Sequence, residues 1–280
     1  MHVWPYLTRL ELLALIATLA LLTVWSIVID APLEAPADPA HTPAVSKAPW
    51  YFVGLQELLV YFDPWIAGVV LPGLIILGLM LLPYLDPNVK GSGYYTLSQR
   101  WFAVSTFVFA FVVLWIGPIL VGTFLRGPGW HLFWPWEAWD VQQVSPIPNR
   151  DLHEWIALLP ASLGLAPDGG FAGGWQTFFS RPGVGVALGL TVLGLFYALG
   201  LRYFGHLVGV QGRIVQLLWG RNLGLASFSP RSFRAELGRR RYYIAGFFYV
   251  TMLGLMLKIV LRLVFHIQYI VRIPWIDANV

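Results

Sequence analysis

Long apolar stretches, separated by shorter polar segments, dominate the pattern along the chain. A helix needs about 20 mostly apolar residues to cross the hydrocarbon core of a bilayer. Stretches of about that length occur at five places: 10–29, 65–82, 101–121, 184–201 and 242–264. The pattern therefore predicts an all-α polytopic membrane protein with about five transmembrane helices.

The segments between these stretches differ from one another in composition. Residues 30–47 are rich in proline, which does not sustain a helix, and predict an extramembrane loop. Residues 51–61 predict a short interfacial helix that Asp63-Pro64 ends, and residues 205–219 predict an amphipathic interfacial segment. The tryptophan-rich stretch 127–183 predicts a folded cap on the membrane surface or against a partner.

We therefore expect three regions. The first is a membrane domain over 1–126 that contains an outer loop over 31–65. The second is the extramembrane loop over 127–183. The third, over 184–280, holds two further transmembrane helices joined by an arginine-rich segment.

The distribution of basic residues predicts how the helices are oriented. The loops after the second and fourth spans are basic, and the loops after the first and third are acidic. Because basic loops stay in the cytoplasm, we expect an inner membrane of the bacterial type, a cytoplasmic N-terminus and an outer C-terminus. Lys258, Arg262 and Arg272 oppose this trend, and we expect them to pair with acidic loop residues.

Composition excludes several kinds of chemistry. The chain has no cysteine, so it offers no disulfide, no cysteine ligand for an iron–sulfur cluster, no cysteine nucleophile and no covalent haem attachment. Its six histidines are scattered over loops and chain ends, so we expect no metal site. His41 in the proline-rich loop has the best location for a role at an outer site. The mild positive charge indicates no nucleic-acid binding.

Four short motifs, in order along the chain, resemble a known family. They are Pro-Ala-Asp-Pro at 36–39, Thr-Pro at 42–43, Pro-Trp-Tyr-Phe at 49–52 and Pro-Tyr-Leu at 83–85. With their flanking spans they resemble the C-terminal half of cytochrome b, and in particular the separate subunit IV of cytochrome bf-type complexes. The resemblance extends from residue 10 to about residue 121.

The resemblance implies a quinol-oxidation site on the outer side of the membrane. The family carries a Pro-Glu-Trp-Tyr motif there, so the quinone-binding residues implied in this chain are Pro49, Trp50, Tyr51, Phe52 and Gln56. The family's glutamate is thought to accept a proton from quinol. Here Pro49 stands at that position, so the motif reads Ala-Pro-Trp-Tyr.

Glu57 is the candidate replacement for the missing carboxylate. It lies seven residues after Trp50, which is about two helical turns, so a helix would place both on one face. Beside aromatic rings, a half-buried carboxylate would be a candidate proton acceptor. The alternative is that Glu57 pairs with an arginine of a partner or extends to water.

The resemblance predicts a membrane subunit of a quinol:cytochrome c type oxidoreductase, inactive alone, that forms part of the outer quinol-oxidation site in proton-coupled electron transfer. It implies quinol as substrate, haem b held by a cytochrome b N-terminal-type dihaem subunit, a Rieske-type iron–sulfur protein, a c-type cytochrome, bound lipid and a dimeric complex. Two alternatives are a non-catalytic anchor subunit, which the missing glutamate favours, and a transporter, which the nearly charge-free first four spans disfavour.

Overall fold

The structure, a computed structural model, describes residues 3–30, 36, 39–40, 46–86, 97–139, 149–162, 164, 171–220, 228–273 and 279–280. Within these ranges every regular element is a helix, and extended pairing is limited to two isolated bridges. The all-α expectation is confirmed. The chain forms two compact units, Met1–Pro43 and Ala44–Val280, each of which is described by itself. His41 lies outside the described residues.

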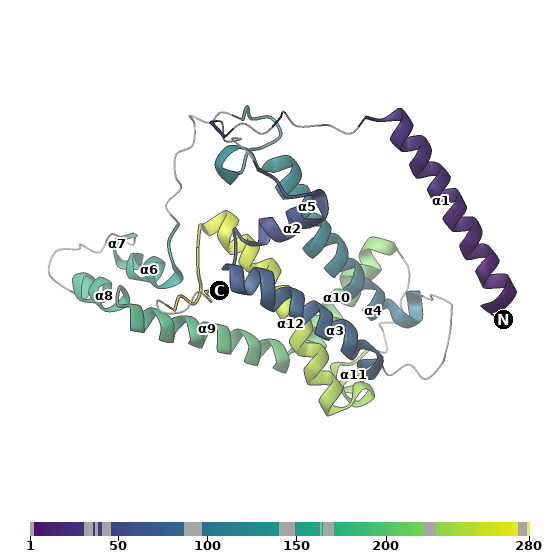
Figure 1. Ribbon diagram of the computed structural model, residues 1–280. Helices are drawn as coiled ribbons and strands as arrows, with labels where there is room; N and C mark the ends of the chain where they lie inside the picture. Colours follow the sequence, from purple (N-terminus) through teal and green to yellow (C-terminus); the bar gives the residue numbers. More distant parts are fainter. Residues whose placement is uncertain are drawn as a thin grey trace. The chain divides into compact units, whose positions relative to one another are not determined.

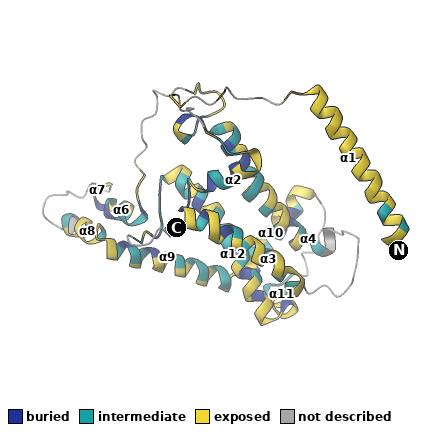
Figure 2. Cartoon of the chain, viewed as in Figure 1, coloured by how far each residue is buried: buried dark blue, intermediate teal, exposed yellow. Residues whose placement is uncertain are grey.

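The described residues of the first unit contain one helical run. A π-helical turn, η1 (Val3–Leu7), leads into α1 (Thr8–Val28). The helix α1 is apolar on all sides, and none of its residues is buried (Figure 2). A helix that is apolar all round is suited to lipid or to a neighbouring subunit rather than to water.

The second unit supplies four further helices long and apolar enough to cross a membrane. These are η2 (Ile66–Val70) with α3 (Leu71–Leu85), the run from Arg100 to Leu125, α9 (Pro182–Arg202) and α12 (Arg239–Phe265). With Val3–Val28, the described residues contain five such helices, and the expected spans are confirmed to within a few residues. These helices fit an integral membrane protein.

The third span changes its helical geometry along its length. It consists of α4 (Leu97–Val108), η3 (Phe109–Ile116), α5 (Gly117–Leu120) and η4 (Val121–Leu125), where the η elements are π-helical. Pro118 has no N–H to donate to the preceding turn, and wider turns are one way in which a membrane helix accommodates this loss.

The remaining helices are short or lie outside the spans. They are α2 (Trp50–Leu58), η5 (Pro128–Trp130), α6 (Leu152–Ala157), α7 (Leu159–Ser162), α8 (Phe171–Phe179), α10 (Phe204–Trp219) and α11 (Pro230–Leu237). The expected short helix after the proline-rich loop is α2, and the expected amphipathic segment is α10. The tryptophan-rich region contains η5 and α6 to α8. The three-region division proposed from sequence stays a prediction.

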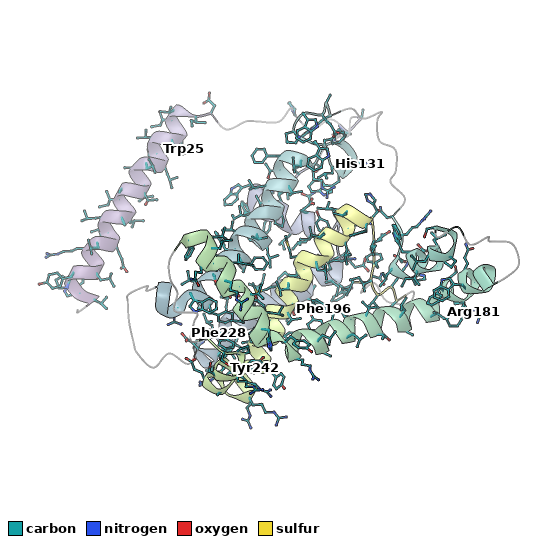
Figure 3. The ribbon with its side chains drawn as sticks, turned by 180° about the vertical axis from the view of Figure 1, so that it is seen from behind. Trp25, His131, Arg181, Phe196, Phe228 and Tyr242 are labelled. Carbon is teal, nitrogen blue, oxygen red and sulfur yellow. The ribbon has the colours of Figure 1, made fainter. Side chains whose placement is uncertain are left out.

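Two buried clusters hold the second unit together. The first joins α4, α10, α11 and α12 through aromatic rings, and Figure 3 shows Phe228 and Tyr242 at this end of the unit. The second joins α2, the start of the second span and α12 through Leu58, Tyr61, Phe62, Ala67 and Leu71, against which Leu255 and Ile259 pack. This second cluster fixes the position of α2, which Figure 1 shows beside α5.

Candidate functional site

Close glycine contacts hold α2 against the end of the third span. Pro49 precedes the helix, and its carbonyl accepts hydrogen bonds from Phe52 and Val53. A Cβ on Gly122 would lie 2.4 Å from Val53 Cγ1, and one on Gly54 would lie 3.0 Å from Ile119 Cγ1. Two residues without side chains therefore allow the two backbones to approach closely.

Glu57 lies at the centre of the resulting interface and is fully buried, with 0% of its surface exposed. Arg126 donates to both of its carboxylate oxygens, from Nη2 to Oε1 at 2.6 Å and from Nε to Oε2 at 2.9 Å. Tyr61 Oη donates to Oε1 at 2.6 Å, and Trp130 Nε1 donates to Oε2 at 3.2 Å. Both oxygens of Glu57 are therefore occupied by donors of this chain.

A tight turn brings Trp130 to this site. Arg126 ends the third span, and the chain reverses so that Phe133 N donates to Leu125 O at 2.8 Å. Gly129 and Trp130 both have positive φ, at 64° and 60°, which for tryptophan costs about 1–2 kcal/mol. In this conformation the Trp130 carbonyl accepts from Arg126 Nη1 at 3.0 Å. The turn thus completes the hydrogen bonding of the buried guanidinium.

The electrostatics keep Arg126 charged and Tyr61 neutral. Burial alone would lower the pKa of Arg126, but the hydrogen bonds and charge of Glu57 outweigh burial and raise the pKa above its usual value. Burial, and then the negative charge of Glu57, raise the pKa of the Tyr61 hydroxyl. The site is therefore a buried ion pair with a neutral phenol that donates to it.

The predicted quinone-binding aromatics lie at the exposed start of α2. Trp50, Tyr51 and Phe52 expose 67%, 47% and 53% of their surface, and their rings follow one another at centroid distances of 5.6 and 4.8 Å. Glu57 is buried, so Trp50 and Glu57 have different surroundings. The structure therefore brings the three rings together at an open edge and buries the carboxylate two turns further along the same helix.

Gln56 and Pro49 shape the entry to α2. The side chain of Gln56 accepts from Ala48 N at 2.9 Å through Oε1 and donates to Ser46 O at 3.1 Å through Nε2. Lys47 Nζ donates to Thr123 O at 2.7 Å. Gln56 and Lys47 therefore tie the segment before Pro49 to α2 and to the third span.

Comparison with known proteins places this geometry in a family context. A family model described as cytochrome b (C-terminal)/b6/petD matches the segment that carries α2, the second span and most of the third. Residues 36–123 match the cytochrome b C-terminal family. Cytochrome b of Acanthamoeba castellanii is 30% identical over 90 residues, which are 32% of this chain and 23% of that protein. No solved structure matches the chain.

The Glu57–Arg126 pair crosses the end of the cytochrome b-like segment, residues 36–123. Glu57 and Tyr61 lie inside it, whereas Arg126 and Trp130 follow it in the chain. Ion pairing is one of the two roles predicted for Glu57 from the sequence, with an arginine of a partner as the counter-ion. The partner found here is Arg126 of the same chain. The contact between Tyr61 and Glu57 could have been predicted from the sequence, since Tyr61 follows Glu57 by four residues, about one helical turn.

A second buried carboxylate holds the C-terminal residues. Asp63 accepts from Tyr269 Oη at 2.5 Å, and from Asn279 N at 2.9 Å and Nδ2 at 2.5 Å. The hydrogen bond to Asp63, after burial, raises the pKa of Tyr269. Asp63 was expected to end the short helix together with Pro64. It also ties the segment after α12 to the start of the second span.

Asp151, His153 and Glu154 are the described residues whose ligand atoms come close enough to suggest a metal, within 4.8 Å of one another. Helix capping and ion pairing account for two of them. Glu154 accepts from Asp151 N at 3.1 Å at the start of α6, and Arg272 Nη1 donates to Asp151 at 3.1 Å. The expectation that Arg272 pairs with an acidic loop residue is thus confirmed.

Proposed function

We propose that this chain is a membrane subunit of a cytochrome bc- or bf-type complex and that α2 forms part of its outer quinol-oxidation site. One observation carries the proposal. A buried ion pair between Glu57 of the cytochrome b-like segment and Arg126, just after it, fixes a short helix whose first turn presents three exposed aromatic rings. Fixed rings at an open edge are suited to bind a flat, amphiphilic ring.

The aromatic edge would contact the quinol head group. Trp50 and Tyr51 each combine an apolar ring with a polar tip, and they meet edge to face at 5.6 Å. Such a pair offers both ring contacts and a hydrogen-bond donor to a quinol. Pro49 and Gln56 would shape this edge through the backbone, because Gln56 holds the residues just before Pro49.

Glu57 is better suited to positioning than to proton transfer. A proton acceptor needs a free oxygen within hydrogen-bond reach of its donor, and both Glu57 oxygens already accept from Arg126. As a positioning residue, Glu57 holds α2 against the end of the third span. Its expected role as proton acceptor stays a prediction, which requires Arg126 to move away during turnover.

The electron path would lie mostly in partner subunits. A dihaem cytochrome b-type subunit would hold both b haems, a Rieske-type iron–sulfur protein would take the first electron from quinol, and a c-type cytochrome would follow. In this arrangement the chain contributes a wall of the quinol pocket in a dimeric, proton-translocating complex. The basic loops would face the cytoplasm and the quinol site would face the outer side.

A non-catalytic anchor subunit is the second candidate. Two observations favour it, namely Pro49 at the position of the family's glutamate and the full occupation of Glu57 by Arg126, Tyr61 and Trp130. An anchor would assemble with the haem-bearing subunit but would contribute nothing to quinol turnover.

Alanine substitutions in the assembled complex separate the two candidates. Trp50→Ala and Tyr51→Ala should each lower kcat/KM for quinol roughly tenfold, because each removes a ring from the pocket. Trp136→Ala is the matched control, since Trp136 is also an exposed tryptophan outside the spans but lies apart from α2 in sequence. Unchanged turnover in both α2 variants, with assembly intact, would favour the anchor.

A further inference from the structure

The turn after the third span, residues 126–139, meets the chain on both sides of the exposed rings of α2. In the C-terminal half of the helix, Glu57 Oε2 accepts from Trp130 Nε1 at 3.2 Å. Just before the helix begins, Lys47 Nζ lies over the Trp139 ring, 4.9 Å from its centre. The 126–139 turn therefore has two separate contacts through which it can hold α2.

Lys47 joins the segment before α2 to two neighbours at once. Its Nζ atom donates to the Thr123 carbonyl at 2.7 Å. Thr123 lies in the last turn of the third span, where carbonyl groups lack partners within the helix and carry the negative end of the helix dipole. The same ammonium group lies over the Trp139 ring, whose π-electrons attract a cation. One side chain thus links the entry of α2 to both the third span and the 126–139 turn.

The packing inside this turn keeps Trp139 within reach of Lys47. The rings of Phe133 and Trp139 lie against the backbone of Gly127, where a Cβ atom would be 2.7 Å and 3.2 Å from them. The centres of the two rings are 6.3 Å apart. Phe133 N donates to the Leu125 carbonyl at 2.8 Å, which holds the packed rings at the end of the third span. Contacts within the turn therefore also fix the position of Trp139.

The other cations near the candidate site hold later parts of the chain. Lys258 donates from Nζ to the Gln268 carbonyl, which follows the last span. Neither Lys258 nor Arg262 forms an ion pair among the described residues, so the pairing with acidic loop residues expected for them is not found there. Lys47, by contrast, lies directly before α2.

We propose that Lys47 and Trp139 are positioning residues for the start of α2, and that the 126–139 turn thereby sets the orientation of the exposed aromatic rings. In this role neither residue contacts quinol. The consequence for turnover rests on the proposed quinol function, whereas the coupling between the turn and α2 does not. The proposal gives part of the tryptophan-rich region, which lies beyond the cytochrome b-like segment, a role in the candidate site.

Amide hydrogen exchange in the assembled complex tests the coupling without quinol. Trp139→Leu removes the aromatic ring but keeps an apolar side chain. Exchange at the amides of Phe52 and Val53, which donate to the Pro49 carbonyl, should accelerate roughly two- to fivefold. Trp136→Leu is the matched control, because Trp136 is an exposed tryptophan of the same turn that stacks on another tryptophan. Unchanged exchange at both amides in Trp139→Leu would overturn the proposal.

Lys47→Met tests the other side of the contact. Methionine has no group that donates to Thr123 and no charge to attract the ring, so exchange at Phe52 and Val53 should again accelerate. In the Lys47→Met background, Trp139→Leu should have no further effect, because the contact is already lost. A full further effect would show that the two residues act independently and would contradict the proposal. Lys47→Arg should restore slow exchange, since arginine keeps the charge, a donor and the ability to stack on a ring.

Quinol kinetics separate the positioning role from the proposed function itself. Lys47→Met should raise KM for quinol roughly two- to fivefold with kcat nearly unchanged, because displaced rings weaken binding, and Lys47→Arg should restore KM. Arg181→Met, which removes an exposed cation before α9, should leave KM unchanged. A normal KM in Lys47→Met, while Trp50→Ala lowers kcat/KM, would overturn the positioning role. If Trp50→Ala also has no effect, the proposed function fails, and the exchange measurements still decide the coupling.

Discussion

The Glu57–Arg126 pair is the residue-scale feature on which the candidate site depends. Its two side chains are 0% and 6% exposed, so water does not solvate either charge. Such a pair contributes little compared with apolar side chains of the same size, but the loss of one member leaves an unpaired buried charge. The main effect of the pair is therefore to fix the position of α2 against the third span, and its net contribution to the free energy of unfolding is small.

Removal of one partner should be strongly destabilising. Arg126→Gln leaves the buried carboxylate without its main donor and should lower the free energy of unfolding by about 3–5 kcal/mol. Arg240→Gln, an exposed arginine, should change it by less than about 0.5 kcal/mol. The measurement is unfolding in mixed micelles of increasing SDS content. The double variant Glu57→Leu/Arg126→Met should recover most of the loss, and a loss as large as in the single variant would contradict the pairing account.

Tyr61 should make stability depend on alkaline pH. Because burial and Glu57 raise the pKa of Tyr61, the folded chain keeps the phenol neutral above the usual tyrosine value of about 10, while the unfolded chain ionises it. The stability from Tyr61 is therefore complete below pH of about 10 and is lost as pH rises above it. The melting temperature of the unsubstituted chain should exceed that of Tyr61→Phe up to about pH 9. This difference should shrink above about pH 10, and a constant difference would show that Tyr61 does not titrate in this way.

At the scale of elements, the fit of α2 against the third span depends on Gly122. A methyl group there would lie 2.4 Å from Val53 Cγ1, which is too close for any real contact. Gly122→Ala should cost about 1–3 kcal/mol and should slow any quinol turnover that α2 supports. Gly68→Ala, with nothing within 4 Å of the added atom, is the control and should be neutral or slightly stabilising.

A second substitution shows whether the contact with Val53 is the cause. Val53→Ala removes the Cγ1 atom that the new methyl group meets. The pair Gly122→Ala/Val53→Ala should therefore be less destabilised than the sum of the two single variants. Strict additivity would show that Gly122 is required for another reason.

Asp63 should control how firmly the residues after α12 are held. Asp63→Asn removes the charged acceptor of Tyr269 and Asn279 and should cost about 1–3 kcal/mol locally. Hydrogen exchange at the amides of 267–273 should accelerate. Asp86→Asn is the control, because Asp86 lies at the other end of the same span and pairs with Arg100 at a partly exposed position. No change in exchange at 267–273 would contradict the role of Asp63.

At the scale of the whole molecule, the sequence was sufficient for the spans but not for the site. Long apolar runs and prolines act locally, so they predicted five helices and a short helix before the second span. The contacts of Glu57 depend on residues 69 and 73 positions away, and no local pattern relates Glu57 to Arg126 or Trp130. The same holds for Asp63, which meets Tyr269 across 206 positions.

Residues of the cytochrome b-like segment also contact residues from the later part of the chain. Arg126 and Tyr269 both lie after residue 123, yet they donate hydrogen bonds to Glu57 of α2 and to Asp63 before the second span. The later helices therefore complete the polar environment of the candidate site.

Contact between quinol and the first turn of α2 can be measured by photolabelling. A quinone carrying a photoreactive group on its head is bound to the intact complex, irradiated, and mapped by peptide mass spectrometry. We expect labels on residues 49–56, centred on Trp50 and Tyr51, that an excess of unlabelled quinol removes. Labels confined to other subunits, with none on α2, would contradict it.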